Sequence, residues 1–309
     1  MCTAITYRTR DFYFGRTLDY ECGYAEEITV TPRGYLGNRY ALIGMATVVD
    51  GYPLYYDAVN EVGLCMAGLN FVQNACYQSG EGVAPHELIP RTLGGCATVA
   101  QARQMLEETR LISHGFGDLP IARLHWLVAD KQECLVVEPH EEGLRLYDNP
   151  MGVLANDPPF PMQMWHLRAF RHLSPQTPPS DFGLPLEAIG RGTGSVGLPG
   201  DFTSPSRFVR AAFTRANAVS FTSETESVSQ FFHMLDAVSI PRGVCDIGEG
   251  HYHHTLYSSC INASRGIYYC TTYDNRRIAA VTLERTGERL RRYPIFRQME
   301  IDSLKEVML

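Results

Sequence analysis

Strand-like segments open and close this chain, and helix-like segments lie between them in groups. CTAITY (2–7) and FYFGRTL (12–18) flank the polar turn RTRD, which predicts a hairpin that begins at residue 2. The chain ends on three further strand-like runs, TLYSSCIN (255–262), GIYYCTTY (266–273) and RRIAAVTL (276–283). Because strands and helices are grouped rather than alternating, this order favours an α+β fold in which helices pack on antiparallel sheets.

The middle of the chain contains both kinds of element. Strands are predicted in EEITVTPRGY (26–35), in YALIGMATVVDGY (40–52) and in a meander over 124–149. Helical periodicity is clearest in 96–111, where Thr98 and Gln101 have capping-box spacing, and it returns in 204–219 and 226–238. Residues 174–185 are rich in Pro and Ser and predict a surface loop rather than a linker. We therefore expect a single domain over residues 2–309.

Composition excludes several classes of partner. The 309-residue chain has a formal net charge of −7 and no block of Lys or Arg, so nucleic acid and anionic membrane surfaces are not expected partners. No secretion signal and no apolar stretch long enough to span a bilayer is recognised. The nine cysteines are scattered without C-x-x-C spacing, which is typical of unpaired thiols in a reducing compartment. The expected location is the cytoplasm.

Two short motifs suggest a ligand and are rejected. GTGSVG (192–197) matches the dinucleotide pattern, but prolines at 199 and 205 prevent a helix from opening inside it, so a tight structural loop is expected. HYHH (251–254) offers three imidazoles without further ligands at metal spacing, so a solvated loop is expected there. No metal and no organic cofactor is predicted.

A cysteine stands directly after the initiator methionine, at the head of the first predicted strand. Met1 is expected to be removed before so small a residue, which would leave Cys2 with a thiol and a free α-amine on the same carbon. These two groups titrate in a similar range, so the amine can accept the thiol proton at little cost. A buried cysteine in an ordinary strand is the alternative. Cys2 is thus a candidate nucleophile with its own base.

The predicted hairpin brings two charged residues toward this candidate. If the second strand returns beside the first, Arg16 and Asp19 lie near Cys2. A guanidinium next to a thiol favours the thiolate, and a carboxylate can orient an α-ammonium group. Each of these residues taken separately is more often a surface residue, so this interpretation depends on the hairpin.

Five sequence blocks in order are more specific than any one of them: MCT (1–3), FGRTLDY (14–20), NEVGLCMAGLNF (60–71), VLANDPPF (153–160) and GRGTGSVGLPGDFTSPSRFVR (190–210). Together with the closing GIYYCTTYDN, they resemble the conjugated bile acid hydrolase (choloylglycine hydrolase) and penicillin V acylase family of N-terminal nucleophile hydrolases. The resemblance covers nearly the whole chain. It implies a four-layer αββα sandwich of two antiparallel sheets between helices, and an amidase that acts on non-peptide carbon–nitrogen bonds without a cofactor.

The resemblance also assigns roles to residues at matching positions. Cys2 is implied as the nucleophile, with its own amine as the general base. Arg16 is implied to stand beside the thiolate, and Asp19 is implied to partner the amine. Asn70 and Asn156 are implied to form the oxyanion and amine-positioning pair. Arg207 is implied to support the site electrostatically. Asparagine amides suit an oxyanion because they are fixed neutral donors.

The substrate is a narrower question. In the family, Asn at the position of Asn70 goes with bile salt hydrolases, whereas penicillin acylases more often have Tyr there, so amides of bile acids with glycine or taurine are favoured. Positions that line the steroid cleft of relatives correspond to Leu18, Val49 and Tyr56, which by composition alone are ordinary core residues. The same chemistry on penicillin V or acyl-homoserine lactones is the second hypothesis. A catalytically silent binding protein is the third, and the intact set of polar positions argues against it.

Two features depart from the family pattern. Asp157 follows the Asn of the LAN block, where a small polar residue is common, and its negative charge could discourage an anionic leaving group or pair with an arginine. The region 172–190 is compact, and relatives often assemble into tetramers through it. The resemblance therefore allows a homotetramer without fixing the oligomeric state.

Overall fold

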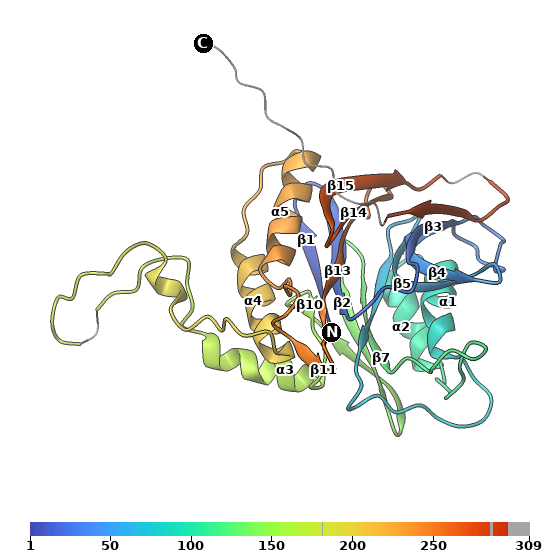
Figure 1. Ribbon diagram of the computed structural model, residues 1–309, viewed down its shortest axis with the longest axis horizontal. Helices are drawn as coiled ribbons and strands as arrows, with labels where there is room; N and C mark the ends of the chain where they lie inside the picture. Colours follow the sequence, from blue (N-terminus) through green and yellow to red (C-terminus); the bar gives the residue numbers. More distant parts are fainter. Residues whose placement is uncertain (181, 285–286, 296–309) are drawn as a thin grey trace, which may run out of the picture.

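Two antiparallel sheets lie face to face in the computed structural model, which describes residues 1–180, 182–284 and 287–295 (Figure 1). Helices cover the outer face of each sheet, which gives four layers. The predicted αββα arrangement of an α+β fold is confirmed. Residues 296–309 of the predicted single domain lie outside the described part of the chain.

The first sheet contains the N-terminal hairpin predicted from the sequence. Within the described residues it has six strands in the spatial order β10 (Val153–Leu154), β1 (Cys2–Arg8), β2 (Phe12–Tyr20), β13 (His254–Asn262), β14 (Ile267–Thr272) and β15 (Asn275–Thr282). β1 pairs with β2 along its whole length, from Cys2 opposite Leu18 to Arg8 opposite Phe12. The prediction of an N-terminal hairpin is confirmed.

The second sheet is a long meander closed by a late strand. Its eight described strands follow the order β16 (Arg291–Pro294), β3 (Glu27–Thr31), β4 (Leu42–Val49), β5 (Tyr52–Asn60), β6 (Cys65–Asn70), β7 (Leu124–Ala129), β8 (Cys134–His140) and β9 (Gly143–Asp148). The single strand expected over 40–52 is instead β4 and the start of β5, because Asp50 and Gly51 both have positive φ and make a tight hairpin turn. A separate two-stranded ribbon joins β11 (Asp246–Gly248) to β12 (His251–Tyr252).

Five α-helices in the described residues complete the layers: α1 (Leu88–Gly95), α2 (Val99–Glu107), α3 (Phe160–Leu167), α4 (Ser204–Asn217) and α5 (Glu224–Asp236). Helices α4 and α5 pack on β1, β2 and β13, while α1 and α2 cover the second sheet (Figure 1). Thr98 caps α2 as predicted, since its side chain accepts the backbone N–H of Gln101. None of these helices is both long enough and apolar enough to cross a membrane.

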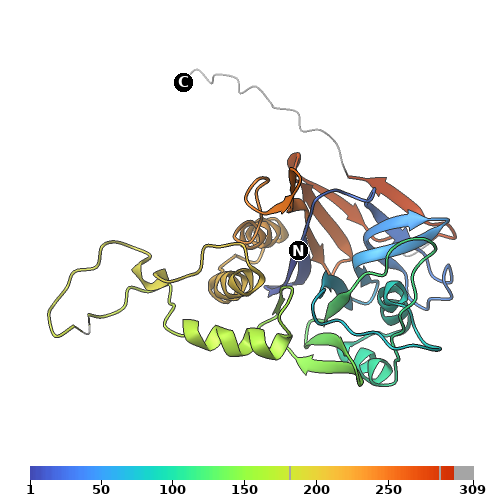
Figure 2. The ribbon, with the colours of Figure 1, turned by 60° about the horizontal axis from the view of Figure 1, so that its bottom comes forward.

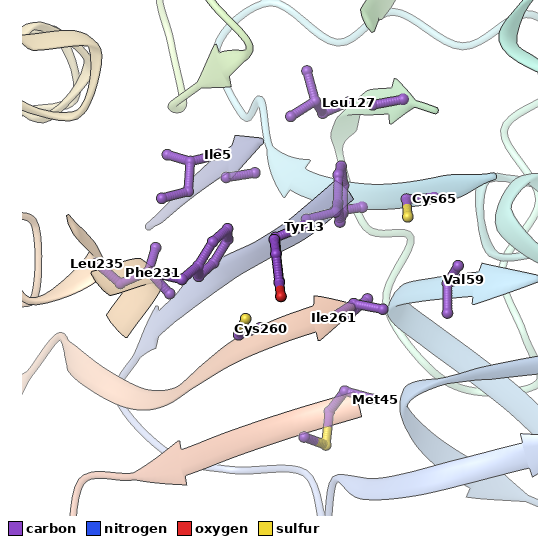
Figure 3. Packing of buried hydrophobic residues seen from close by; sticks show 14 of the residues in the cluster. Ile5, Tyr13, Met45, Val59, Cys65, Leu127, Phe231, Leu235, Cys260 and Ile261 are labelled. Atoms are coloured by element: carbon purple, nitrogen blue, oxygen red, sulfur yellow. The ribbon is translucent and has the colours of Figure 1, made fainter. Parts of the chain in front are cut away.

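The main core fills the space between the sheets and the space under α4 and α5. Figure 3 shows this packing, with Phe231 and Leu235 of α5 near Ile5 of β1 and with Val59 and Leu127 contributed by the second sheet. A second core lies between the outer face of the second sheet and α1 and α2. Gly15 of β2 is required by this packing, because a Cβ there would lie 2.0 Å from the carbonyl oxygen of Ser259 in β13.

An arm formed by residues 171–203 extends away from the body of the molecule (Figures 1 and 2). Its regular structure, in the residues described, is one short 3₁₀ turn at Thr193–Ser195. The turn lies within GTGSVG, where Gly192 and Gly197 have positive φ, and α4 begins only at residue 204. The predicted tight loop is therefore confirmed, and the Pro- and Ser-rich surface loop forms the outer part of this arm.

Candidate active site

The β1–β2 hairpin places the Cys2 side chain between the two sheets. Cys2 and Leu18 are directly opposite each other in the register, so their side chains share one face. Cys2 is buried, with 2% of its surface exposed. Met1 extends the pairing, because its carbonyl oxygen accepts the backbone N–H of Asp19 at 2.8 Å. The nucleophile candidate is thus held at the end of a paired strand.

Arg16 joins Cys2 to the second sheet. One guanidinium nitrogen, Nη2, donates to the Cys2 Sγ, and the other, Nη1, donates to the carbonyl oxygens of Gly68 in β6 and Tyr56 in β5. Burial alone would lower the pKa of Arg16, but the negative groups around it, with Cys2 the strongest, raise that pKa above its ordinary value. The guanidinium therefore stays charged beside the Cys2 sulfur.

Asn156 holds the backbone nitrogen of Cys2. Its Oδ1 accepts the Cys2 N–H at 2.7 Å, and its Nδ2 donates to the carbonyl oxygen of Asn70 at 2.8 Å. The main chain of Asn156 is itself fixed by two hydrogen bonds. Its N–H donates to the Ser204 hydroxyl, and its carbonyl oxygen accepts from Gln163. The nitrogen that would become the free amine thus has one oriented hydrogen-bond acceptor.

Arg207, from the first turns of α4, ties these groups together from the other side of the first sheet. Its Nη1 donates to the Cys2 carbonyl oxygen at 2.5 Å and to the Thr3 hydroxyl at 2.6 Å, while Nη2 donates to Asn156 Oδ1 at 2.8 Å. Burial lowers the pKa of Arg207, and Asp19 opposes this effect. Arg207 Nη1 lies 3.8 Å from the Asp19 carboxylate.

The Asp19 carboxylate accepts from two threonine hydroxyls, Thr255 at 2.6 Å and Thr17 at 3.1 Å. Its link to Cys2 in the described residues passes through Arg207 rather than through a direct bond to the Cys2 nitrogen. The implied pairing of Asp19 with the amine therefore remains a prediction, and Asn156 is the residue that contacts that nitrogen here.

Asn70 ends β6, at the position opposite Leu124 of β7. Its carbonyl oxygen is occupied by Asn156, and within the described residues its side-chain amide has no hydrogen-bond partner. The amide donors of Asn156 and Asn70 thus differ, since the first is engaged in structure and the second is open to a ligand. The oxyanion role of Asn70 remains a prediction.

The three residues implied to line the substrate cleft lie at different distances from the sulfur. Leu18 is the cross-strand neighbour of Cys2, and Tyr56 offers its carbonyl oxygen to Arg16 and its hydroxyl to Thr47. Val49 is the last residue of β4, next to the turn to β5. The structure brings Leu18 and Tyr56 to the site and places Val49 at a hairpin end.

Several polar residues of the site were missed by the sequence analysis. Thr3 and Thr17 lie inside the recognised blocks MCT and FGRTLDY and could have been found by their hydroxyls, whereas Gln163 and Thr255 lie outside the blocks and gave no signal. Thr17 and Thr255 hold the Asp19 carboxylate, Gln163 holds the main chain of Asn156, and Thr3 accepts from Arg207. Buried polar side chains need such partners.

The histidines of HYHH do not form the solvated loop that was expected. His251 is exposed in β12, but His254 begins β13, is buried and bonds to Arg242. The expectation was wrong because the segment continues the sheet next to Tyr20. In the part of the chain that is described, no three His, Cys, Asp or Glu side chains are placed to hold a metal ion.

The fold and the paired N-terminal strand place the chain in the class of N-terminal nucleophile hydrolases. A solved variant of the conjugated bile acid hydrolase from Clostridium perfringens superposes with a TM-score of 0.90 at 31% identity, covering 97% of this chain and 99% of that one. The penicillin V acylase from Agrobacterium tumefaciens shares the fold with a TM-score of 0.75 at 20% identity, covering 94% of this chain and 90% of the other.

Sequence relatives narrow the class further. Residues 2–290 match the family of linear amide C–N hydrolases, choloylglycine hydrolase family. A bile salt hydrolase/transferase of Lactiplantibacillus plantarum is 47% identical over 92% of this chain and 92% of its own length, and one of Clostridium perfringens is 32% identical over 98% and 100%. The chain belongs to the choloylglycine hydrolase family. It is a hydrolase of linear amide C–N bonds, as the resemblance implied.

Proposed function

We propose that this enzyme hydrolyses the amide of bile acids conjugated to glycine or taurine, with Cys2 as an N-terminal nucleophile. The observation that carries the proposal is the arrangement at Cys2, where Arg16 holds the sulfur and Asn156 holds the nitrogen. The similarity to bile salt hydrolases over nearly the whole chain supports the choice of substrate.

The first step is acylation. After Met1 is removed, the Cys2 nitrogen becomes an α-amine that takes the thiol proton, and Arg16 stabilises the thiolate. The sulfur attacks the amide carbonyl to form a C–S bond, and the α-ammonium gives its proton to the nitrogen of the departing glycine or taurine. The Asn156 oxygen keeps the amine directed during both proton transfers.

The second step is deacylation. The α-amine accepts a proton from water, the resulting hydroxide attacks the thioester carbonyl, and the thiolate leaves to regenerate the enzyme. Negative charge develops on the same carbonyl oxygen in both steps. The Asn70 amide is the proposed donor to that oxygen, because its N–H groups are unoccupied and its position at the end of β6 is fixed.

Substrate choice separates this proposal from its runner-up. Penicillin V, and likewise an acyl-homoserine lactone, offers the same amide chemistry on a smaller acyl group. The large side chains of Leu18 and Tyr56 beside the site favour the steroid acyl group, and two relatives that cover 92% and 98% of this chain are named bile salt hydrolases.

The test is release of the amine product by purified enzyme in reducing buffer, with glycocholate, taurocholate and penicillin V offered separately at equal concentration. The proposal predicts faster release from at least one bile salt than from penicillin V. Hydrolysis of penicillin V alone would contradict the substrate and support the runner-up.

We also propose that the chain acts as a single domain that assembles as a homotetramer in the cytoplasm. The arm over residues 171–203 presents large apolar side chains to solvent at Phe182, Leu184, Leu186 and Ile189, and such side chains are expected to be covered by another copy. All nine cysteines are unpaired, which fits a reducing compartment.

Light scattering during size-exclusion chromatography tests the assembly. A homotetramer has four times the 34.6 kDa mass of one chain. Replacing Phe182 and Ile189 by Ser is expected to reduce that mass, whereas replacing the exposed Val219, which lies outside the arm, is expected to leave it unchanged. A wild-type mass of one chain would contradict the tetramer.

A further inference from the structure

Two hydrogen bonds run side by side between the end of β6 and the segment after β10. In the first, Asn156 Nδ2 donates to the Asn70 carbonyl oxygen at 2.8 Å. In the second, Asn74 Nδ2 donates to Asp157 Oδ1 at 2.6 Å. The second bond joins residues 83 positions apart in the chain. Both bonds therefore connect the turn that follows Asn70 to the residues next to the Cys2 nitrogen.

Asn74 belongs to the turn that directly follows Asn70. The Phe71 carbonyl oxygen accepts the backbone N–H groups of Asn74 at 3.3 Å and Ala75 at 2.9 Å, and the Phe71 N–H donates to Arg123 O at 2.8 Å. The turn is thus a compact unit, so that a displacement of Asn74 is passed to Asn70.

The segment that carries Asp157 is held in place by hydrogen bonds from α3. Gln163 of α3 donates from Nε2 to the carbonyl oxygens of Asn156 at 2.6 Å and Pro158 at 2.7 Å, on either side of Asp157. Gln163 is buried, with 1% of its surface exposed. Asp157 is therefore fixed by its neighbours, and its side chain can hold the turn in place.

We propose that Asn74 and Asp157 are a positioning pair that fixes the Asn70 amide for the oxyanion of the reaction. This inference rests on the oxyanion role of Asn70 in the proposed function. Oxyanion donors contribute because they are placed before charge develops, and a misplacement of about 1 Å can cost on the order of 100-fold in rate. In the described residues, neither Asn74 nor Asp157 has a hydrogen bond to Cys2. Their effect reaches the substrate through Asn70.

The pair uses the Asp157 carboxylate as a hydrogen-bond acceptor and not as one half of an ion pair. The negative charge of Asp157 could have paired with an arginine. Its partner is instead the neutral amide of Asn74. An amide oxygen at position 157 would serve equally well. This property allows the hydrogen bond to be tested separately from the charge.

Four variants make that separation. Asn74→Ala and Asp157→Ala remove the bond, while Asp157→Asn keeps an acceptor and removes only the charge. The double variant Asn74→Asp with Asp157→Asn reverses the direction of the bond, with donor and acceptor exchanged. We expect kcat to fall about tenfold in both Ala variants and to stay within about twofold of wild type in the other two.

The readouts distinguish positioning from general damage. Values of kcat and KM are measured on whichever of glycocholate, taurocholate and penicillin V the wild type hydrolyses fastest, so an error in the proposed substrate does not affect this test. Alkylation of Cys2 by iodoacetamide is measured on the peptide that contains Cys2. This reaction needs no oxyanion donor, so its rate is expected to equal that of the wild type in all four variants. Exposed Cys22 is the internal reference for that rate.

Three results would overturn the inference. The first is wild-type kcat in both Ala variants. The second is an equal loss in the reversed pair and in the Ala variants, because that loss would follow the identity of the side chains rather than the bond between them. A parallel fall in Cys2 alkylation would likewise place the damage at the nucleophile and not at Asn70.

Discussion

The Asn156 side-chain oxygen accepts the Cys2 backbone N–H at 2.7 Å, although 154 positions separate the two residues in the chain. The same oxygen accepts from Arg207, and the amide nitrogen of Asn156 donates to Asn70. One asparagine therefore links the candidate base, the buried cation on α4 and the candidate oxyanion residue. The proposed mechanism depends on this link, because amine and oxyanion donor must act on the same carbonyl group.

Replacing Asn156 by Ala is expected to lower kcat by about 100-fold. The amine loses its hydrogen-bond acceptor, and the Asn70 carbonyl oxygen loses the hydrogen bond from Asn156. Steady-state kinetics measure the effect. Asn156→Asp is informative as a comparison, because it keeps an acceptor toward Cys2 but turns an oxygen toward the Asn70 carbonyl oxygen. Wild-type kcat in Asn156→Asp would show that the bond to Asn70 is dispensable.

Replacing Arg16 by Lys is expected to lower kcat/KM by on the order of 100-fold. A single ammonium group cannot serve the sulfur of Cys2 and the carbonyl oxygens of Gly68 and Tyr56 together. The substitution also removes the hydrogen bond from the guanidinium to the Cys2 sulfur, so alkylation of Cys2 by iodoacetamide is expected to slow.

Arg215→Lys is the matched control for Arg16. Arg215 is partly buried, whereas Arg16 is fully buried, and it bonds to Thr6 in the half of β1 away from Cys2. Its substitution should leave the rate of Cys2 alkylation unchanged. An equal fall in the alkylation rate of both variants would contradict the specific role of Arg16.

Glu26 gives a prediction about stability and pH. Burial raises the pKa of its carboxyl, the backbone N–H groups of its own loop offset only part of this, and neither oxygen has a well-formed hydrogen bond in the described residues. The raised pKa means that the protonated form stabilises the fold below the ordinary Glu pKa and that this stability is lost as pH rises through the folded-state value.

Glu26→Gln stays neutral at every pH, so its Tm should rise relative to wild type between pH 4.5 and pH 7.5, by about 2 °C or more. Thermal unfolding at the two pH values measures the difference. The exposed Glu81→Gln is the control and should show a constant difference. A Glu26→Gln difference that does not change with pH would contradict the account of the buried carboxyl.

The parts of the fold that could be predicted are those with local patterns. The polar turn at RTRD and the capping residues of α2 act over a few positions, and the spacing of the hairpin was enough to bring Arg16 toward Cys2. Helices α1 and α3 were missed. They are only eight residues long and contain prolines at 90 and 161, so neither gives the longer periodic pattern that predicts a helix from sequence.

Long-range partners could not be read from local patterns. Asn156 and Arg207 were identified through the resemblance alone, because nothing in their neighbourhood says that they will meet Cys2. The same holds for Thr255, which reaches Asp19 across the sheet, and for Asn74 with Asp157. Such contacts depend on the register of strands and on crossings between layers, which are set by the whole fold.

The most direct test of the central claim is a peptide map of active wild-type enzyme after one equivalent of iodoacetamide has removed its activity. The account predicts that the N-terminal peptide begins at Cys2 without Met1, and that the loss of activity parallels modification of that peptide. Full activity in protein that retains Met1, or inactivation that follows modification of another cysteine, would contradict it.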